Sequence, residues 1–388
     1  MIYSHVFAPK VGGVETYVML LAQGMAEHCV RVTVITSTPA GTMDDSQLPF
    51  RVVRQPGVIK LFQLLRQAEV VHLAGPSLVP LWMAILLRKP VVIEHHGYQA
   101  ICPNGLLFFE PTKTICPDHF MAHRYHKCLK CNAVTNGWGK SLGGLLLTIP
   151  RRVASSLATR NIAISRHVEG RLRLPRTQVI YYGIRDPQQC GSSAPDGACG
   201  SGESPRTFAY VGRLVSEKGL GLLIEAASRL ETAGRTFQIK MIGDGPERNH
   251  LQERVDSTDL GHRVSFTGSL QGEALESALS DVSTVVMPSI WEETAGLSAI
   301  EQMMRGRLVI ATDIGGLGEM LGDAGLKFPC GDVERLTNCF QVALDKPNLV
   351  TELGKAARAR AAQVFSHQRM VNDYMKVFSQ ALRARAGL

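Results

Sequence analysis

The sequence predicts an α/β protein with two domains, each built around a parallel sheet. Three observations lead to this prediction. The chain has 388 residues, which exceeds the roughly 250–300 residues that one hydrophobic core supports. Short apolar runs alternate with helical patterns on both sides of one irregular stretch, as in parallel sheets covered by helices. That stretch, between Arg185 and Arg206, is rich in Gly, Ser and Pro and is typical of an exposed linker.

The apolar runs are the predicted strands, and the linker sets the domain bounds. We expect strands at 30–36, 70–73, 91–94, 162–164, 207–211, 238–242, 264–267, 284–287 and 309–312. We place the domains at 1–186 and 206–365, the linker at 187–205, and a C-terminal helix at 366–388 that packs back on the N-terminal domain, within a helical stretch 351–388. Ligands of parallel sheets lie beyond the carboxyl ends of the strands, so we expect a cleft between two facing domains.

Charge is distributed unevenly along the chain. The formal net charge is +8, but residues 1–186 hold 21 Lys/Arg and 10 Asp/Glu, whereas residues 187–388 hold 21 and 24. This basic excess favours contact with anionic lipid head groups or an anionic acceptor, the alternative being a merely solubilising surface. No run is long enough to cross a membrane and no signal-peptide pattern follows Met1. We therefore expect a cytoplasmic protein, at most peripheral on the inner face of the membrane.

The most informative stretch, 288–301, carries two carboxylates around a helix start. It follows a buried strand, and apolar residues recur at helical spacing from Leu297 onward. This pattern puts Glu293 in the strand-to-helix loop before Gly296, and Glu301 just over two turns beyond it. Carboxylates accept hydrogen bonds from hydroxyls and helix starts attract anions, so the stretch suits a ligand that has both hydroxyls and phosphate. A sugar nucleotide is such a ligand.

A basic loop at 212–219 follows the strand predicted at 207–211. Arg213 offers a fork for phosphate oxygens and Lys218 a point charge. Cations fixed at this place would stabilise the negative charge that grows on a departing diphosphate. The alternative is that both are ordinary surface charges.

Glycine loops follow three other strand patterns. Gly12 and Gly13 precede a helical pattern, and glycines there let backbone amides approach a phosphate closely. Gly243 and the Gly315–Gly316 pair are open to two interpretations, a ligand loop or a tight turn.

Four of the nine cysteines fall within a short insertion at about 102–131: Cys102, Cys116, Cys128 and Cys131. A structural zinc site and free or redox-labile thiols are the two interpretations, because only one half of the set has the tight Cys-x-x-Cys spacing. Beyond the cysteines, an apolar stretch from Trp138 to Ile149 has basic flanks. It fits either a helix lying in a membrane interface or a buried core helix.

Together, the stretches 288–301 and 212–219 with Gly12–Gly13, His96–Gly97 and Gly331–Asp332 resemble a family-four retaining glycosyltransferase of GT-B fold. The resemblance spans about residues 1–365. It implies two facing Rossmann-like domains with the donor held by the C-terminal one. The cysteine-rich insertion is similar to one that some family members carry after the histidine-containing loop.

The resemblance also implies roles for individual residues. Arg213 and Lys218 would hold the donor diphosphate, Glu301 the ribose and Glu293 the hydroxyls of the transferred sugar. The expected catalytic residues are Arg213, Lys218, Glu293 and His96, the last near the sugar and acceptor. The expected donor-binding residues are Gly12, Gly13, Gly243, Glu293, Gly296, Leu297 and Glu301. Where relatives carry Pro-Phe, this chain has Thr294–Ala295, which changes the expected contacts with the transferred sugar. The resemblance therefore predicts the type of reaction more firmly than the identity of the donor sugar.

The resulting hypothesis is a retaining hexosyltransferase that needs no cofactor or metal for catalysis. It would move a sugar from a UDP- or GDP-sugar to a glycan or lipid-linked acceptor, in cell-surface polysaccharide or glycolipid synthesis, with no nucleic acid partner. A sugar-nucleotide epimerase or a phosphorylase on the same architecture is the alternative enzyme. The third hypothesis is a non-catalytic, zinc-stabilised binding module for anionic polymers. The paired acids argue against it, because they would repel a polyanion.

Overall fold

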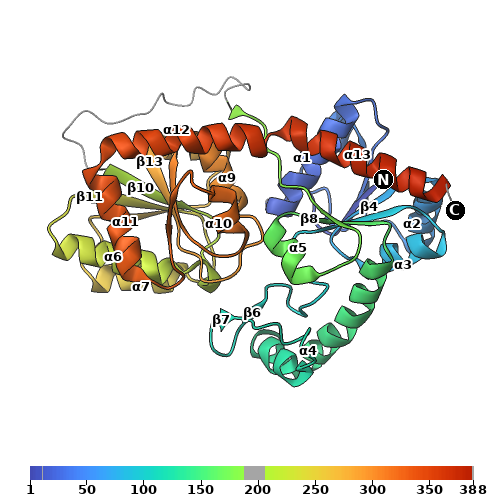
Figure 1. Cartoon of the computed structure of the whole chain (residues 1–388), viewed down its shortest axis with the longest axis horizontal. Coiled ribbons are helices and arrows are strands. Elements are labelled where there is room, and N and C mark those ends of the chain that lie inside the picture. Colours follow the sequence, from blue (N-terminus) through green and yellow to red (C-terminus); the bar gives the residue numbers. More distant parts are fainter. Residues whose placement is uncertain (11, 188–205, 387–388) are drawn as a thin grey trace. The chain divides into compact units, whose positions relative to one another are not determined.

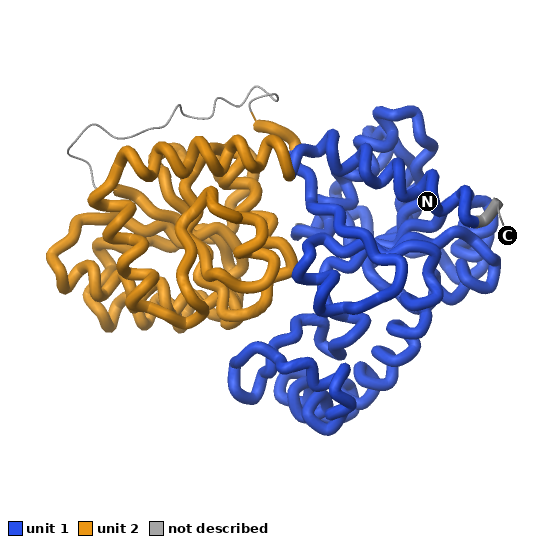
Figure 2. Tube along the Cα trace, viewed as in Figure 1, with its two compact units in different colours: residues 1–184, 365–388 blue, residues 185–364 orange. Residues whose placement is uncertain are grey.

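The computed structural model describes residues 1–10, 12–187 and 206–386. The chain forms two compact units, shown in Figures 1 and 2. Unit 1 contains Met1–Ile184 and Phe365–Leu388, and unit 2 contains Arg185–Val364. Nearly all of the predicted linker, 187–205, lies outside the described residues.

Unit 1 is built on a parallel sheet with the strand order β3-β2-β1-β4-β5-β8-β9. Its strands are β1 (Ile2–Ser4), β2 (Thr33–Thr36), β3 (Arg51–Arg54), β4 (Val71–Ala74), β5 (Val91–His95), β8 (Arg160–Ala163) and β9 (Thr177–Val179). The central strands β4 and β5 are buried along their whole length, because helices cover both faces of such a sheet. The order changes direction between β1 and β4, which creates a switch point at the carboxyl edge.

The helices of unit 1 fall into two groups by what they contact. They are α1 (Gly13–Glu27), α2 (Val58–Gln67), α3 (Leu78–Leu86), α4 (Tyr125–Leu157), α5 (Arg166–Leu172) and α13 (His367–Ala386), with the short helix η1 (Asp45–Gln47) and the hairpin β6 (Phe108–Phe109)–β7 (Thr114–Ile115). Helices α1 and α13 pack on each other, and α13 also contacts β5. Helices α2 and α3 share a core with the end of α4. Helix α4 is interrupted at Gly137 (φ 76°, ψ 164°).

Unit 2 has a second parallel sheet, with the order β12-β11-β10-β13-β14-β15. Its strands are β10 (Arg206–Val211), β11 (Phe237–Ile242), β12 (Val264–Gly268), β13 (Val282–Met287), β14 (Leu308–Thr312) and β15 (Leu326–Phe328). Its helices are η3 (Ser216–Lys218), α6 (Leu220–Thr232), α7 (Arg248–Ser257), α8 (Gly272–Ala278), α9 (Leu297–Met304), α10 (Gly315–Leu321), α11 (Val333–Asp345) and α12 (Pro347–Val364). The switch point of this sheet lies between β10 and β13.

The strands predicted from apolar runs are confirmed, with ends shifted by up to a few residues. The helical stretch predicted at 351–388 consists of two helices, because α12 stops at Val364 and α13 starts at His367. Between them the backbone pairs with Ile184 instead: Ile184 N donates to Phe365 O (2.9 Å) and His367 N donates to Ile184 O (3.0 Å). Within the described ranges, no helix combines the length and apolar character needed to cross a bilayer.

Candidate active site

The switch point of unit 2 brings the two predicted donor loops into contact. The loop 212–219 follows β10 and the loop 288–296 follows β13, and these strands are neighbours in the sheet. The amide of Ile290 donates to the carbonyl oxygen of Glu217 (3.0 Å), which joins the loops. Gly219 makes this approach possible: it has φ +65°, and a Cβ there would lie 2.1 Å from the carbonyl oxygen of Pro288.

At this junction Lys218 and Glu293 form a largely buried ion pair. Lys218 Nζ lies 2.8 Å from Glu293 Oε1, and the side chains are 18% and 7% exposed. The hydroxyl of Ser289 donates to the same carboxylate oxygen. The Lys218 ammonium also lies 5.8 Å from the centroid of the Trp291 ring, where the ring face attracts a cation. The pair therefore holds one positive and one negative group in fixed positions at the carboxyl edge of the sheet.

A second glycine contact supports Glu293 from the other side. Gly315 and Gly316 begin α10, and the amide of Gly316 donates to the carbonyl oxygen of Glu293 (2.6 Å). A Cβ at Gly315 would lie 2.6 Å from that oxygen, and one at Gly316 would lie 2.2 Å from the carbonyl oxygen of Thr294. The glycine pair thus lets α10 begin directly against the Glu293 loop.

Glu301 lies on α9, in the second turn after the loop. Gly296 precedes the helix with φ +71°, and Leu297 is its first residue. Glu301 is half-buried, and burial raises the pKa of its carboxyl above the ordinary value, with the repulsion of Glu276 adding to this effect and the attraction of Arg305 opposing it. Among the described residues, no side chain or amide donates a hydrogen bond to this carboxylate. Glu301 is therefore an acceptor that a ligand hydroxyl can satisfy.

Arg213 lies in the same loop as Lys218 but faces solvent. Its side chain is 71% exposed, and its nearest acidic partner, Glu217, is 4.0 Å away. The hydroxyl of Tyr210 donates to the Arg213 carbonyl oxygen (2.7 Å), which fixes the backbone but leaves the guanidinium accessible. An exposed guanidinium beside a buried ion pair suits a bidentate contact with phosphate oxygens.

Gly243 lies where β11 ends beside β10. A Cβ at this position would lie 1.8 Å from the carbonyl oxygen of Gly212, and the amide of Gly243 donates to the carbonyl oxygen of Gly268 (2.9 Å). These contacts give Gly243 a packing function between neighbouring strand ends. Its contact with a donor stays a prediction.

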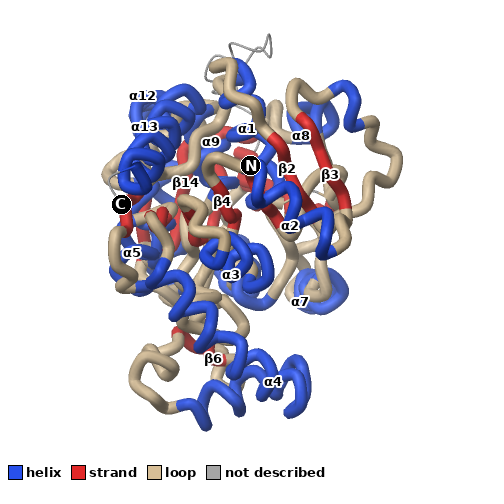
Figure 3. The backbone as a smooth tube through the Cα atoms, turned by 90° about the vertical axis from the view of Figure 1, so that its right-hand side faces the viewer, coloured by secondary structure: helices blue, strands red, loops and turns tan. Residues whose placement is uncertain are grey.

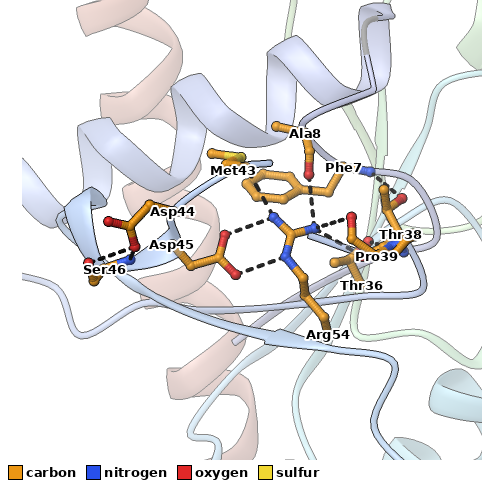
Figure 4. A network of polar contacts seen from close by, with 10 residues as sticks. All are labelled: Phe7, Ala8, Thr36, Thr38, Pro39, Met43, Asp44, Asp45, Ser46 and Arg54. Carbon is orange, nitrogen blue, oxygen red and sulfur yellow. Dashed lines mark hydrogen bonds and ion pairs between the residues drawn. The ribbon is translucent and has the colours of Figure 1, made fainter. Parts of the chain in front are cut away.

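In unit 1, the loop that leads to Gly12 and Gly13 is held by an arginine. Figure 4 shows Arg54, the last residue of β3, donating to the carbonyl oxygens of Ala8 (2.9 Å) and Thr38 (3.0 Å). The same guanidinium makes two 2.8 Å hydrogen bonds to the Asp45 carboxylate. It thereby ties the loops after β1 and β2 together, just before Gly12 caps the start of α1.

His96 follows β5 and lies in a buried aromatic cluster of unit 1. The hydroxyl of Tyr182 is 2.6 Å from Nδ1, Oε2 of Glu94 is 3.7 Å from Nε2, and the Tyr17 ring packs edge-on at 4.9 Å between centroids. Burial lowers the pKa of His96 to about 3 and raises the pKa of Glu94 to about 8. His96 is therefore neutral at physiological pH. The neighbouring His95 bonds to Asn161 inside the sheet (3.0 Å) and has a structural function.

Two family models match the chain in succession. Residues 11–186 match "Glycosyltransferase Family 4" and residues 198–360 match "Glycosyl transferases group 1". The chain belongs to the family 4 glycosyltransferases. The first match covers most of the N-terminal part of unit 1, and the second contains both loops of the unit 2 switch point.

Curated relatives match parts of this glycosyltransferase. The 2-deoxystreptamine glucosyltransferase of Streptomyces kanamyceticus is 33% identical over 165 residues, which is 42% of this chain and 42% of that protein. The sulfoquinovosyl transferase of Arabidopsis thaliana is 26% identical over 354 residues, 89% of this chain and 63% of its own length. The matches therefore cover less than two thirds of these relatives.

Solved structures resemble the chain over nearly its whole length. HepE of Anabaena in complex with UDP and glucose has a TM-score of 0.71 at 18% identity and covers 98% of this chain and 99% of its own. Sucrose-phosphate synthase from Thermosynechococcus elongatus has a TM-score of 0.72 at 22% identity, with 99% of both chains covered. These likenesses confirm the GT-B fold, with its two Rossmann-like parallel-sheet domains.

The four cysteines of this glycosyltransferase are all buried, and none forms a disulfide: Cys102, Cys116, Cys128 and Cys131. Burial and the neighbouring thiols raise the pKa of Cys128 to about 12. Cys102 Sγ donates to Asn104 Oδ1 (2.8 Å) and Cys131 Sγ to the Phe108 carbonyl oxygen (3.4 Å). In the described part of the chain, no group of three or more His, Cys, Asp or Glu side chains is arranged to hold a metal ion. A structural zinc ion stays a prediction, which metal analysis of the purified protein tests.

Several residues of the candidate site were not found by sequence reasoning. Ser289 and Trp291 lie within the stretch 288–301. Their contacts with the Lys218–Glu293 ion pair become visible only in the folded structure. Arg54 and Tyr182 are separated by tens of residues from the loops they hold. No spacing pattern connects either of them to its partner.

Proposed function

We propose that this glycosyltransferase moves a sugar from a UDP- or GDP-sugar to a hydroxyl of a glycan or lipid-linked acceptor, with retention at the anomeric carbon. The observation that carries the proposal is the Lys218–Glu293 ion pair at the unit 2 switch point, where donor ligands of such sheets bind. The complexes of HepE with UDP, UDP-glucose, or UDP and glucose support a nucleotide-sugar donor.

Each side chain has a place in this proposal. The accessible guanidinium of Arg213 and the oriented ammonium of Lys218 stabilise the diphosphate as its negative charge grows. Glu293 accepts hydrogen bonds from the sugar hydroxyls with the oxygen that its protein partners leave available. Glu301 accepts them from the ribose. In this arrangement the cations bind the phosphates and the carboxylates accept hydrogen bonds from the hydroxyls.

The proposed transfer needs no protein base and no divalent cation. The acceptor oxygen bonds to the anomeric carbon as the bond from that carbon to the phosphate oxygen breaks, and the acceptor proton passes to that phosphate oxygen. A nucleoside diphosphate then leaves. Glu293 is already engaged by Lys218 and Ser289, which suits a positioning contact better than nucleophilic attack. His96 is neutral, so it acts as a hydrogen-bonding group in this scheme.

The basic charge of residues 1–186 supports an acceptor that carries anionic groups or is held at an anionic surface. We place such an activity in cell-surface polysaccharide or glycolipid synthesis.

Release of nucleoside diphosphate from a panel of sugar nucleotides tests the proposal. We expect release from one donor class, at least a hundredfold slower for Lys218→Ala or Glu301→Ala. Lys240→Ala is the matched control, because Lys240 of β11 pairs with Asp281 (2.6 Å) rather than with a residue of the site. An epimerised donor without diphosphate release would overturn the proposal in favour of an epimerase. Release that is equally fast in all variants would remove the assigned roles.

A further inference from the structure

One side of unit 1 carries an unusual density of exposed apolar side chains. Among the described residues, fourteen large apolar side chains are exposed, and thirteen of them lie on α2, α3 and α4. They are Val58, Ile59, Phe62, Val79, Leu86, Val134, Trp138, Leu142, Leu146, Leu147, Ile149, Val153 and Leu157. Figure 3 shows the three helices together on the side that faces the viewer. We call these thirteen residues the α2–α4 surface.

Helix α4 contributes a continuous stripe to this surface after its break at Gly137. Its members recur every three or four residues: Trp138, Leu142, Leu146, Ile149, Val153 and Leu157. At 3.6 residues per turn this spacing keeps all six within an arc of about 100°. The buried residues Ser141, Leu145 and Thr148 follow another side of the same helix. The stripe is thus an outward face of a helix whose inward face is already packed.

The charged residues of these three helices are all positive. Helices α2, α3 and α4 contain no Asp or Glu and seven Lys or Arg: Lys60, Arg66, Lys127, Lys130, Lys140, Arg151 and Arg152. Lys60, Arg66 and Lys140 are exposed. Exposed apolar side chains on helices whose charged residues are all cations match a surface with an apolar interior and anionic head groups.

We propose that the α2–α4 surface docks unit 1 onto an anionic lipid bilayer, with the α4 stripe lying in the interface plane. The helices lie on the membrane and do not cross it. A second copy of this chain is a poorer occupant, because a two-fold contact through this surface would bring the same seven cations together from both copies. The proposal goes beyond sugar transfer and does not depend on the donor site.

Sedimentation with phospholipid vesicles tests this docking. We expect the protein to bind vesicles that contain phosphatidylglycerol at least tenfold more tightly than vesicles of pure phosphatidylcholine, and binding to weaken as salt rises. The double variant Leu142→Glu, Leu146→Glu should lose at least tenfold in affinity for the anionic vesicles. Leu382→Glu is the matched control, because Leu382 is the one exposed large apolar residue outside the surface among the residues that the structure describes. It should bind as the wild type does.

Tryptophan fluorescence supplies a second readout from the same samples. Trp138 is 68% exposed, so its emission should shift to shorter wavelength on anionic vesicles, and Trp138→Phe should remove the shift. Donor hydrolysis without acceptor should be unchanged in the double variant, which separates this proposal from that for the donor site. Vesicle binding by the folded double variant equal to that of the wild type would overturn the docking surface. A wild-type dimer that the double variant converts to monomer, without vesicle binding, would overturn it in favour of self-association.

Discussion

Breaking the Lys218–Glu293 pair should destabilise unit 2 far more than breaking an exposed pair. The Lys218→Ala change removes the ammonium that lies 2.8 Å from Glu293 Oε1. It leaves a carboxylate that is 7% exposed and has the Ser289 hydroxyl as its remaining side-chain partner. A buried charge that has lost its counter-charge is poorly solvated, so the folded state loses free energy.

The magnitude follows from the burial of the two side chains. Removing one partner of a fully buried pair costs about 3–5 kcal/mol. Because Lys218 is 18% exposed, water can reach the carboxylate after truncation, and we expect a loss of about 2–3 kcal/mol. The loss should shift the thermal midpoint of a unit of this size by about 4–12 °C.

A double-mutant cycle with Lys218→Ala and Glu293→Gln, followed by urea denaturation, measures the coupling free energy. The matched control is Arg229 with Glu225, an ion pair in the same unit at 2.9 Å whose side chains are 48% and 45% exposed. We expect a coupling above about 1.5 kcal/mol for the buried pair and below about 0.5 kcal/mol for the exposed one. Equal coupling in the two cycles would refute the view that burial makes the Lys218–Glu293 pair strong.

Two further predictions concern Glu94 and Gly219. The pKa of Glu94 is raised from 4.5 to about 8, so the folded state holds a proton that the unfolded state has lost, and stability falls as pH rises through this window. Between pH 6.5 and pH 8 the wild type should lose about 1–2 kcal/mol relative to Glu94→Gln, because the buried histidines contribute equally in both proteins and cancel in this comparison; parallel urea-denaturation profiles would contradict this. Gly219→Ala should weaken nucleoside diphosphate binding at least tenfold in calorimetry, because its Cβ would lie 2.1 Å from the Pro288 carbonyl oxygen. Gly234→Ala is the control, because Gly234 has a similar φ of +68° but open space around the added Cβ. A loss of binding in Gly219→Ala with unchanged binding in Gly234→Ala would show that the clash with Pro288, and not backbone strain, causes the loss.

Much of the fold was predictable because buried parallel strands are short continuous apolar runs. β4 and β5 are buried at every position, and both were recognised from their sequences. β3 was not, because its sequence Arg-Val-Val-Arg places charges at both ends of an edge strand and leaves its first residue exposed. The three-residue strands β1 and β9 are too short to show a period.

The local placement of Glu293 and Glu301 could be predicted from the sequence, but the contacts of the candidate site with distant residues could not. The spacing of Glu293 and Glu301 follows from one strand, one loop and one helix, all local. The contact between Lys218 and Glu293 joins residues 75 positions apart and exists because β13 lies beside β10 rather than beside β12. That strand order results from the packing of the whole unit, which no local pattern encodes.

A crystal structure of the protein with a bound UDP- or GDP-sugar tests the central claim most directly. We predict that the diphosphate oxygens contact Arg213 and Lys218, that the ribose hydroxyls bond to Glu301, and that the sugar hydroxyls lie at Glu293. A donor bound away from all four side chains would contradict the assignment of the unit 2 switch point as the donor site.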